Sequence, residues 1–241
     1  MHFFSKFWSR KATEPNLAAA LKKILGFTPR KISLYQKAFT HRSVNIKNSE
    51  GVPINFERLE FLGDAIIDAV VAHYLFITLK NDNEGELTRM KSKIVSRDKL
   101  NSIGKKLHLL DFLICTGKKE NFGVNIYGNL LEALIGAVFI EKGYKTCKKI
   151  VFKLILDPHI NIAEVKKEII SYKSVLIEWG QKQKTPIEFV TEKENSNDLE
   201  INYRCRLFVN EKLLLKVREV SKKKVEEKAA RRAFSILNIK Q

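Results

Sequence analysis

Residues 55–68, NFERLEFLGDAIID, decide the fold and hold the first candidate site. At about 100° per residue, a helix places the acidic side chains of this stretch in one narrow stripe: Glu57, Glu60, Asp64 and Asp68. An apolar set falls on the opposite side: Leu59, Leu62, Ile66, Ala69 and Val70. The pattern predicts a helix, running to about residue 79, with one face in a hydrophobic core.

The acidic stripe itself needs an explanation, because like charges one helical turn apart repel each other and destabilise a helix. A row of carboxylates facing a cleft is tolerated when a cation lies among them, and hard oxygen ligands suit Mg²⁺ or Mn²⁺. A plain solvated face is the alternative. Phe61 argues against it, since this large aromatic also points out of the acidic side. An exposed apolar side chain there suggests a partner surface or a substrate wall.

A second stretch, residues 126–140, reads IYGNLLEALIGAVFI and is apolar except for Asn129 and Glu132. These two share one helix face, and Gly136 follows one turn later, where it would let another backbone or a ligand come close. A buried ionised carboxylate is costly unless it is paired or binds metal. A salt bridge to Arg58 or to a lysine is one explanation. The coincidence with the first acidic helix favours a shared metal site.

Composition narrows the class of partner. The 241 residues carry a formal charge of +17, which indicates a polyanionic partner, nucleic acid first and anionic membrane second. A hydrophobic fraction of 44% indicates globular domains rather than a disordered basic tail. No run approaches the roughly 18 apolar residues of a membrane helix, so we expect no membrane partner. The three cysteines are widely separated and lack metal-ligand spacing, which indicates reduced thiols in a cytoplasmic protein.

The chain divides where its periodicity changes. Residues 1–16 are aromatic and basic but too short in their apolar part for a signal peptide, so we expect a flexible tail. Helical patterns then run through residues 17–157, with His73 on an apolar side and Glu84 opening a helix after a loop. Residues 158–170 have a weaker, charged pattern that is typical of a linker. Because His73 falls on an apolar helix side, we expect it to be a core histidine.

Residues 171–241 show a different order. A helix to about residue 183 is followed by strand-like alternation at 187–189, 201–209 and 213–217, with a turn at 195–198, and then by helical spacing. Ser221 is a plausible N-cap of the last helix, directly before Lys222, Lys223 and Lys224. Lysines at a positive helix N-terminus form an anion trap, although a solvated lysine run is the ordinary alternative.

Two motifs resemble known families. His41-Arg42-Ser43, followed by ERLEFLGD at residues 57–64, closely resembles the signature of ribonuclease III. The αβββα order, with an alanine pair after the lysine cluster, resembles the double-stranded-RNA-binding domain, although that family's glycines before the serine are missing. The resemblance implies an α+β multidomain protein: an all-α endonuclease domain at 17–157, then a small αβββα double-stranded-RNA-binding domain at 171–241.

The same resemblance implies the site residues. Metal would be held by Glu60, Asp64, Asn129 and Glu132, and the catalytic set would be Glu57, Glu60, Asp64, Glu84 and Glu132. RNA would be bound by Lys222, Lys223 and Lys224, and Phe61 would dock into the partner subunit of a homodimer. The implied activity is Mg²⁺-dependent cleavage of double-stranded RNA, with Mn²⁺ able to substitute and no small-molecule cofactor. It would leave 5′-phosphate and 3′-hydroxyl ends and serve rRNA or mRNA precursor processing.

Asn129 departs from that family pattern, which usually has Asp at this position. An amide oxygen can still coordinate Mg²⁺ but brings no negative charge. The alternative function is therefore a catalytically weakened relative that binds double-stranded RNA or serves as a structural protein. A basic protein that binds membranes or DNA non-specifically would explain the charge but not the two acidic helices.

Overall fold

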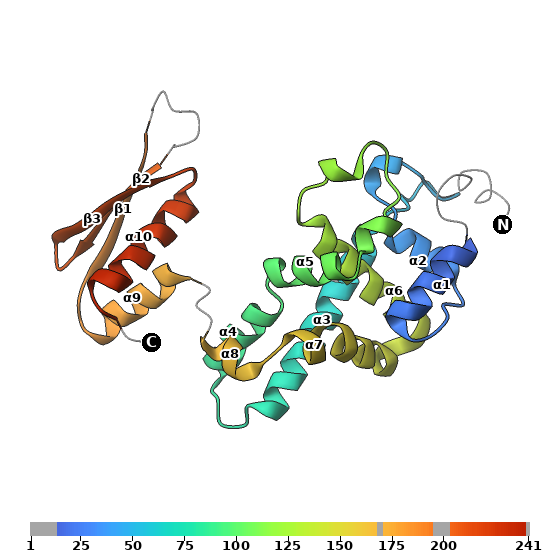
Figure 1. Ribbon diagram of the computed structural model, residues 1–241, viewed down its shortest axis with the longest axis horizontal. Helices are drawn as coiled ribbons and strands as arrows, with labels where there is room; N and C mark the ends of the chain where they lie inside the picture. The colour runs from blue at the N-terminus through green and yellow to red at the C-terminus, as the bar shows by residue number, and fades with distance from the viewer. Residues whose placement is uncertain (1–13, 168–170, 195–202, 240–241) are drawn as a thin grey trace. The chain divides into compact units, whose positions relative to one another are not determined.

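The computed structural model describes residues 14–167, 171–194 and 203–239. The chain splits into two compact units, Met1–Lys166 and Lys167–Gln241 (Figure 1). The described part of the first unit is helical, and the second is built in the order αβββα. This confirms the predicted α+β fold class.

The first unit is organised around two long helices. Its α-helices are α1 (Glu14–Leu25), α2 (Ile32–Ala38), α3 (Glu57–Thr78), α4 (Glu84–Ile94), α5 (Arg97–Lys106), α6 (Ile126–Val151), α7 (Asp157–His159) and α8 (Ile162–Lys167). Three short 3₁₀ turns lie at Arg42–Val44, Leu109–Phe112 and Lys119–Asn121, and a π-helical turn, Phe152–Leu156, extends α6. In Figure 1, α3 and α6 run through the middle of the unit, and α1, α2 and α5 lie around them.

The crossing of α3 and α6 is unusually close because both helices lack a side chain where they meet. A Cβ atom built on Gly63 would lie 1.7 Å from the carbonyl oxygen of Glu132. One built on Gly136 would lie 2.2 Å from the carbonyl oxygen of Leu59. The expected close approach at Gly136 is therefore an approach of the α3 backbone, and it brings the two polar helix faces together.

By length and composition alone, α3 could cross a membrane, which the sequence pattern did not suggest. One side of the helix is fully engaged in the core: Leu59, Ile67, Val70, Val71 and Leu75 are buried. The other side leaves large apolar side chains in the open, with Phe61 79% and Phe76 69% exposed. The apolar character of α3 thus serves two surfaces, the core against α6 and an outer face.

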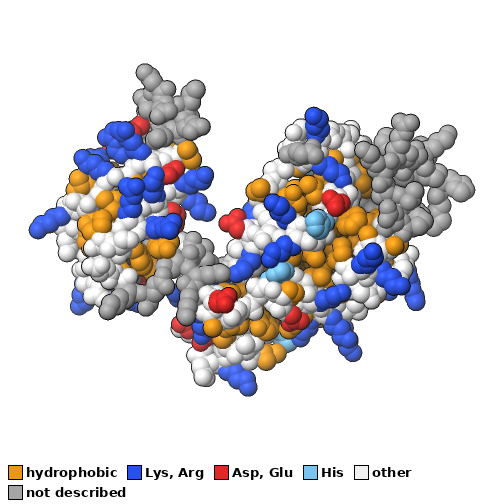
Figure 2. Space-filling model, in the orientation of Figure 1, with side chains coloured by type: hydrophobic (Ala, Val, Ile, Leu, Met, Phe, Trp, Pro, Cys, Tyr) orange, Lys and Arg blue, Asp and Glu red, His pale blue; other side chains and the backbone are white. Residues whose placement is uncertain are grey.

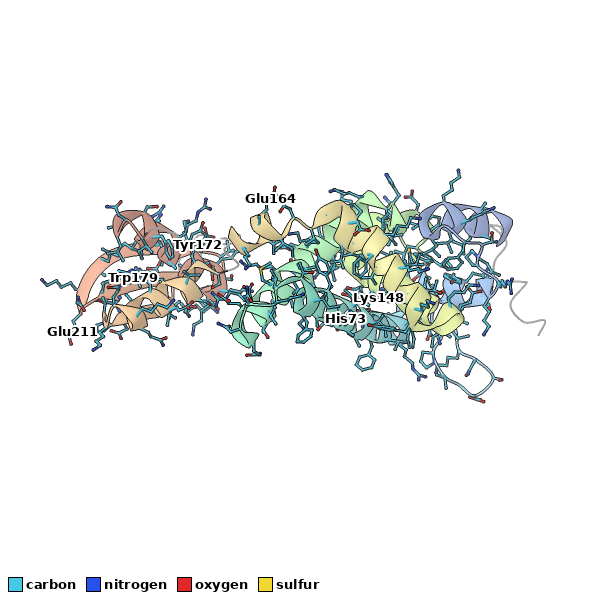
Figure 3. The ribbon with its side chains drawn as sticks, turned by 90° about the horizontal axis from the view of Figure 1, so that it is seen from below. His73, Lys148, Glu164, Tyr172, Trp179 and Glu211 are labelled. Atoms are coloured by element: carbon cyan, nitrogen blue, oxygen red, sulfur yellow. The ribbon has the colours of Figure 1, made fainter. Side chains whose placement is uncertain are left out.

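The buried face of α3 also corrects the expectation for His73. This side chain is exposed, and its Nδ1 atom lies 3.1 Å from Nζ of Lys148 on α6 (Figure 3). Periodicity placed His73 beside Ile66, but packing against α6 centres the buried face on Gly63 and Ile67. Rotating the face in this way carries His73 to the surface, so it is not a core histidine.

Parts of the predicted tail, residues 1–16, and of the predicted linker, residues 158–170, belong to helices. Residues 14–16 already belong to α1, and residues 1–13 of the predicted tail lie outside the described part. Within the predicted linker, Val165 of α8 is buried against the first unit. The buried Lys93 of α4 donates hydrogen bonds from Nζ to the carbonyl oxygens of Val165, at 2.8 Å, and Lys166, at 3.1 Å. Residues 162–166 are therefore part of the helical unit, and residues 168–170 are not described.

The second unit is a three-stranded antiparallel sheet covered on one face by two helices (Figure 1). Its elements are α9 (Tyr172–Lys182), β1 (Ile187–Lys193), β2 (Tyr203–Val209), β3 (Lys212–Glu219) and α10 (Lys222–Ile236). The strands lie in the order β1-β2-β3, so β3 is an edge strand. Inward-facing Cys205, Leu207 and Val217 pack against the alanines of α10. The predicted turn at 195–198 lies outside the described residues.

Candidate functional site

Five of the predicted catalytic and metal-binding residues, together with Phe61, line one cleft of about 660 Å³ beside the α3–α6 crossing. Glu57, Glu60 and Asp64 come from α3, and Asn129 and Glu132 come from α6. The remaining lining residues are His41, Arg42, Phe56, Arg97, Phe122, Gly123, Asn125 and Ile126. The structure thus brings together two stretches that lie about 70 residues apart in the chain.

The position of Glu132 follows from the glycine contact. Its own carbonyl oxygen faces Gly63, so its backbone cannot move away from α3 without opening the crossing. Glu60 lies three residues before Gly63 and Asp64 lies one residue after it, and both project from the same helix face. The close contact of the backbones therefore sets the spacing between the carboxylates of the two helices.

Asn101 on α5 holds the start of α6 in place. This buried side chain accepts a hydrogen bond from the Gly128 backbone N–H at 2.8 Å and donates one to Oδ1 of Asn125 at 3.3 Å. It thereby satisfies one of the free N–H groups at a helix N-terminus. Asn129 follows directly after Gly128, so its place in the cleft depends on this anchor.

Glu57 is held at the mouth of the cleft by its neighbours. Oδ1 of the buried Asn55 accepts the Glu57 backbone N–H at 3.1 Å, and its Nδ2 donates to Oε2 of Glu57 at 3.3 Å. Nη1 of Arg42 lies 3.5 Å from Oε1 of the same carboxylate. Because both charges of this pair are largely exposed, it contributes little stability and leaves Arg42 able to meet an incoming anion.

His41 forms a wall of the cleft with two aromatic rings. Its ring centroid lies 4.4 Å from that of Phe122 and 5.8 Å from that of Phe56. Nδ1 of His41 accepts the Ser43 backbone N–H at 3.0 Å, so in the neutral ring the proton is on Nε2. Burial, and then the charge of Arg42, lower the pKa of His41. The residue is thus a neutral hydrogen-bond donor through its Nε2–H group.

The carboxylates of the cleft destabilise each other's charged forms. Burial, followed by the charges of Asp64 and Glu60, raises the pKa of Glu132 to about 8. Burial and neighbouring carboxylates also raise the pKa values of Glu60 and Asp64. A cluster of this kind takes up either protons or a cation near neutral pH.

The donor chemistry of the cleft suits a hard divalent cation, since it offers four carboxylates and the amide oxygen of Asn129. In the described residues, no three His, Cys, Asp or Glu side chains stand close enough together to hold a metal ion. Side-chain rotation of Glu60, Asp64 and Glu132 is therefore needed before they converge on one.

Arg97 is the cation whose charge acts on Glu132, and no pattern in the sequence indicates it. Arg97 opens α5 and lines the cleft, and its positive charge offsets part of the rise in the pKa values of Glu60 and Glu132. Arg58, the partner considered from the sequence, is exposed and does not line the cleft. The fourth carboxylate of the stripe, Asp68, is neutralised by an ion pair with Lys91 of α4 and lies outside the cleft.

Comparison with known proteins places this cleft in a family. The family model described as Ribonuclease-III-like matches residues 31–159, which contain the whole cleft. The chain is 44% identical to Ribonuclease 3 of Zunongwangia profunda, with 96% of each chain covered. It is 42% identical to Ribonuclease 3 of Flavobacterium psychrophilum, with 98% of this chain and 97% of the relative covered.

The chain belongs to the ribonuclease III family. A solved nuclease domain of ribonuclease III from Campylobacter jejuni is similar to the helical unit, at 35% identity and a TM-score of 0.52. The similarity covers 57% of this chain and 95% of that domain. The chain is thus an enzyme of a nuclease family that cleaves double-stranded RNA, and the resemblance noted from residues 41–43 and 57–64 is confirmed.

In this ribonuclease III, Glu84 is the one member of the predicted catalytic set that the structure does not bring to the cleft. It is the first residue of α4, and its carboxylate accepts a hydrogen bond from Oγ1 of Thr88 at 2.9 Å. The N-cap of this helix is Asn83, whose Oδ1 accepts the Glu86 backbone N–H at 3.0 Å. Glu84 therefore completes a helix terminus in this structure.

The lysine cluster of the second unit lies where the sequence placed it. Ser221 caps α10, accepting the Lys224 backbone N–H on Oγ at 3.3 Å. Lys222, Lys223 and Lys224 follow as exposed side chains at the helix N-terminus. Figure 2 shows Lys and Arg side chains spread over the face of this unit that is in view.

Proposed function

We propose that this ribonuclease III hydrolyses double-stranded RNA with Mg²⁺, or Mn²⁺ in its place, and leaves 5′-phosphate and 3′-hydroxyl ends. The observation that carries the proposal is the cleft at the Gly63–Gly136 crossing, where carboxylates of α3 and α6 share one space. The raised pKa of Glu132, about 8, indicates a site built to receive positive charge. Processing of rRNA and mRNA precursors in the cytoplasm is the role we assign to it.

The roles of the residues follow from their chemistry. A divalent cation, when bound, supplies an activated water and charge neutralisation at the phosphate, so no protein nucleophile is needed. Glu60, Asp64 and Glu132 would hold it through carboxylate oxygens, and Asn129 through its amide oxygen. Arg97 and Arg42 line the same cleft and can hold the phosphates of the substrate strand.

His41 supports substrate binding rather than proton transfer. Its Nδ1 atom is occupied by the Ser43 N–H, which leaves the Nε2–H group to donate to an oxygen of the RNA backbone. The ring is held between Phe56 and Phe122, so its orientation is defined before RNA arrives.

The outer face of α3 supports a homodimer. Phe61 is 79% exposed at the rim of the cleft, and Phe76 and Ile77 are exposed further along the helix. Ile140 and Tyr144 of α6 are exposed as well. Large exposed apolar side chains mark interaction sites. The C. jejuni nuclease domain has a region involved in dimer formation. We assign Phe61 to the contact with a second copy of this chain.

The second unit is assigned to duplex binding. Lysines at the N-terminus of α10 combine positive side chains with the positive end of the helix dipole, which favours phosphate. Recognition of this type reads the shape of an A-form duplex rather than its sequence.

Cleavage of a plain RNA duplex tests the proposal. The native protein should cut it in Mg²⁺ and not in EDTA, and a DNA duplex of the same sequence should stay intact. Glu132→Ala should abolish cleavage and leave the Kd for the RNA duplex, measured in EDTA, within about 2-fold of native. Glu164→Ala, an exposed position on α8, is the matched control and should cut like native (Figure 3). Cleavage that persists in Glu132→Ala would refute the metal-site assignment.

Asn129 supports one second candidate: a catalytically weakened relative that binds duplex RNA without cutting it. The amide lines the cleft at the place where the family pattern has a carboxylate. Duplex binding by the native chain with no cleavage at any Mg²⁺ concentration would favour this candidate.

A further inference from the structure

A basic pocket of about 630 Å³ lies on the second unit at the edge strand β3 and the side of α10. The sixth lining residue is Val217, and the other five are cationic: Arg204, Lys216, Arg218, Lys228 and Arg232. It is distinct from the predicted RNA-binding cluster, because Lys222, Lys223 and Lys224 do not line it.

The positive charge of this pocket is only partly neutralised. Arg204 and Arg218 both pair with Glu194, and Nε of Arg218 lies 2.9 Å from Oε2 of that carboxylate. Nζ of Lys228 lies 2.7 Å from Oε1 of Glu219. Among the residues that the structure describes, two carboxylates therefore face five cations.

Lys216 and Arg232 are exposed, and neither has an ion-pair partner among the residues that the structure describes. Two cations that are not engaged within the fold are available to an anionic ligand.

Helix geometry places the pocket on the opposite side of α10 from Lys223. Arg232 follows Lys223 by nine residues, and at about 100° per residue this places it roughly 180° around the helix from Lys223. Phe234 lies within about 20° of Lys223, and its ring packs on Tyr172 of α9 with 5.4 Å between centroids. Lys223 thus faces the α9 side, whereas Arg232 faces β3. Lys224 lies one turn before Lys228, about 40° from it around the helix, and therefore borders the pocket side. A duplex resting on the α9 side would have to pass around α10 to reach the pocket.

The arrangement of the cations suits a row of phosphates. Lys216 and Arg218 are two residues apart on one strand, about 7 Å, and Lys228 and Arg232 are one helical turn apart, about 6 Å. None of the described residues that line the pocket is aromatic, so they offer no ring on which unstacked bases could stack. These features favour the sugar–phosphate backbone of a duplex over a single phosphate ion or a single strand.

We propose that this pocket is a second RNA-binding surface, which holds the backbone of a second duplex segment of the substrate while the side of α10 that bears Lys223 holds the first. The inference rests on the proposed function, since it assumes that duplex RNA is the ligand. It predicts that the enzyme discriminates between a straight duplex and an RNA with two helical arms.

The test compares three double variants of the full chain. The pocket variant is Lys216→Ala with Arg232→Ala, and the cluster variant is Lys222→Ala with Lys223→Ala. The control, Lys184→Ala with Lys212→Ala, removes two exposed lysines of the same unit that line neither surface. Kd is measured in EDTA over a range of salt, for a duplex of about 16 base pairs and for an RNA with two such arms.

The pocket variant should bind the short duplex within about 2-fold of native but bind the two-armed RNA about 10-fold more weakly, with a salt slope smaller by one to two. The cluster variant should lose affinity for both RNAs. The proposal is overturned if the pocket variant matches the control on the two-armed RNA, or if it loses as much affinity on the short duplex. If the native chain binds neither RNA, the proposed function itself fails.

Discussion

Replacing Gly63 with alanine tests the helix crossing that builds the cleft. The new Cβ would lie 1.7 Å from the carbonyl oxygen of Glu132 and 2.9 Å from the backbone nitrogen of Gly136. Ordinary contact is about 3.5 Å, so the helices must separate by roughly 2 Å. Alanine would normally stabilise a helix by about 1 kcal/mol over glycine. Here overpacking against rigid backbone outweighs that gain, and we expect a net loss of about 2 kcal/mol.

For a unit of this size, such a loss lowers Tm by roughly 4–8 °C. Displacing the carboxylates of α3 from those of α6 by an ångström or more should also reduce Mg²⁺-dependent duplex cleavage at least about 10-fold, even where the variant is folded. Thermal unfolding followed by circular dichroism and a single-turnover cleavage assay measure the two effects.

Gly85→Ala is the matched control, because a Cβ at this position of α4 would meet only Oδ1 of Asn83, at 3.4 Å. This variant should be as stable as native or up to about 1 kcal/mol more stable. If Gly63→Ala has the same Tm as this control and cuts RNA at the native rate, the close crossing does not organise the cleft.

Three further outcomes are expected. The pKa of Glu132 in the folded protein, about 8, lies above its ordinary value of 4.5. Protonated Glu132 therefore contributes its full share of folding stability below pH 4.5, and this contribution is lost as pH rises through 8. Melting curves in EDTA should therefore show stability falling between pH 5 and 9, and Glu132→Gln should flatten this dependence; an unchanged slope would contradict the electrostatic account. Lys93→Met leaves the carbonyl oxygens of Val165 and Lys166 unpaired, at a cost of about 1–3 kcal/mol, and limited proteolysis should cut α8 faster than in native protein. Phe61→Ala should raise the dimer Kd at least about 10-fold in sedimentation equilibrium, and an unaltered dimer would remove Phe61 from the interface.

The central part of the cleft was predictable because it is encoded within single helices. The stripe of Glu57, Glu60 and Asp64 is visible at helical spacing, and so is the polar pair Asn129 and Glu132 in an apolar stretch. Like-charge repulsion and the cost of burying a carboxylate make both patterns improbable unless they share a ligand. The structure places both sets around one cleft.

The remaining features depend on contacts between elements, which spacing within one element does not reveal. Arg97 reaches the cleft because α5 packs on α6, and its sequence neighbourhood gives no sign of this. His73 is exposed because α6 selects which face of α3 is buried. Residues 162–166 looked like linker because their pattern is charged, yet Lys93 from α4 fixes them to the helical unit.

Whether an amide at position 129 still permits catalysis is the most direct test of the account. The rate of RNA duplex cleavage should be measured over a range of Mg²⁺ concentrations for the native protein and for Asn129→Asp. Both proteins should cut, and the native enzyme should need more Mg²⁺ to reach half its maximal rate, because Asn129 lines the cleft without adding negative charge. Cleavage by Asn129→Asp alone, with the native chain inactive at every Mg²⁺ concentration, would contradict it.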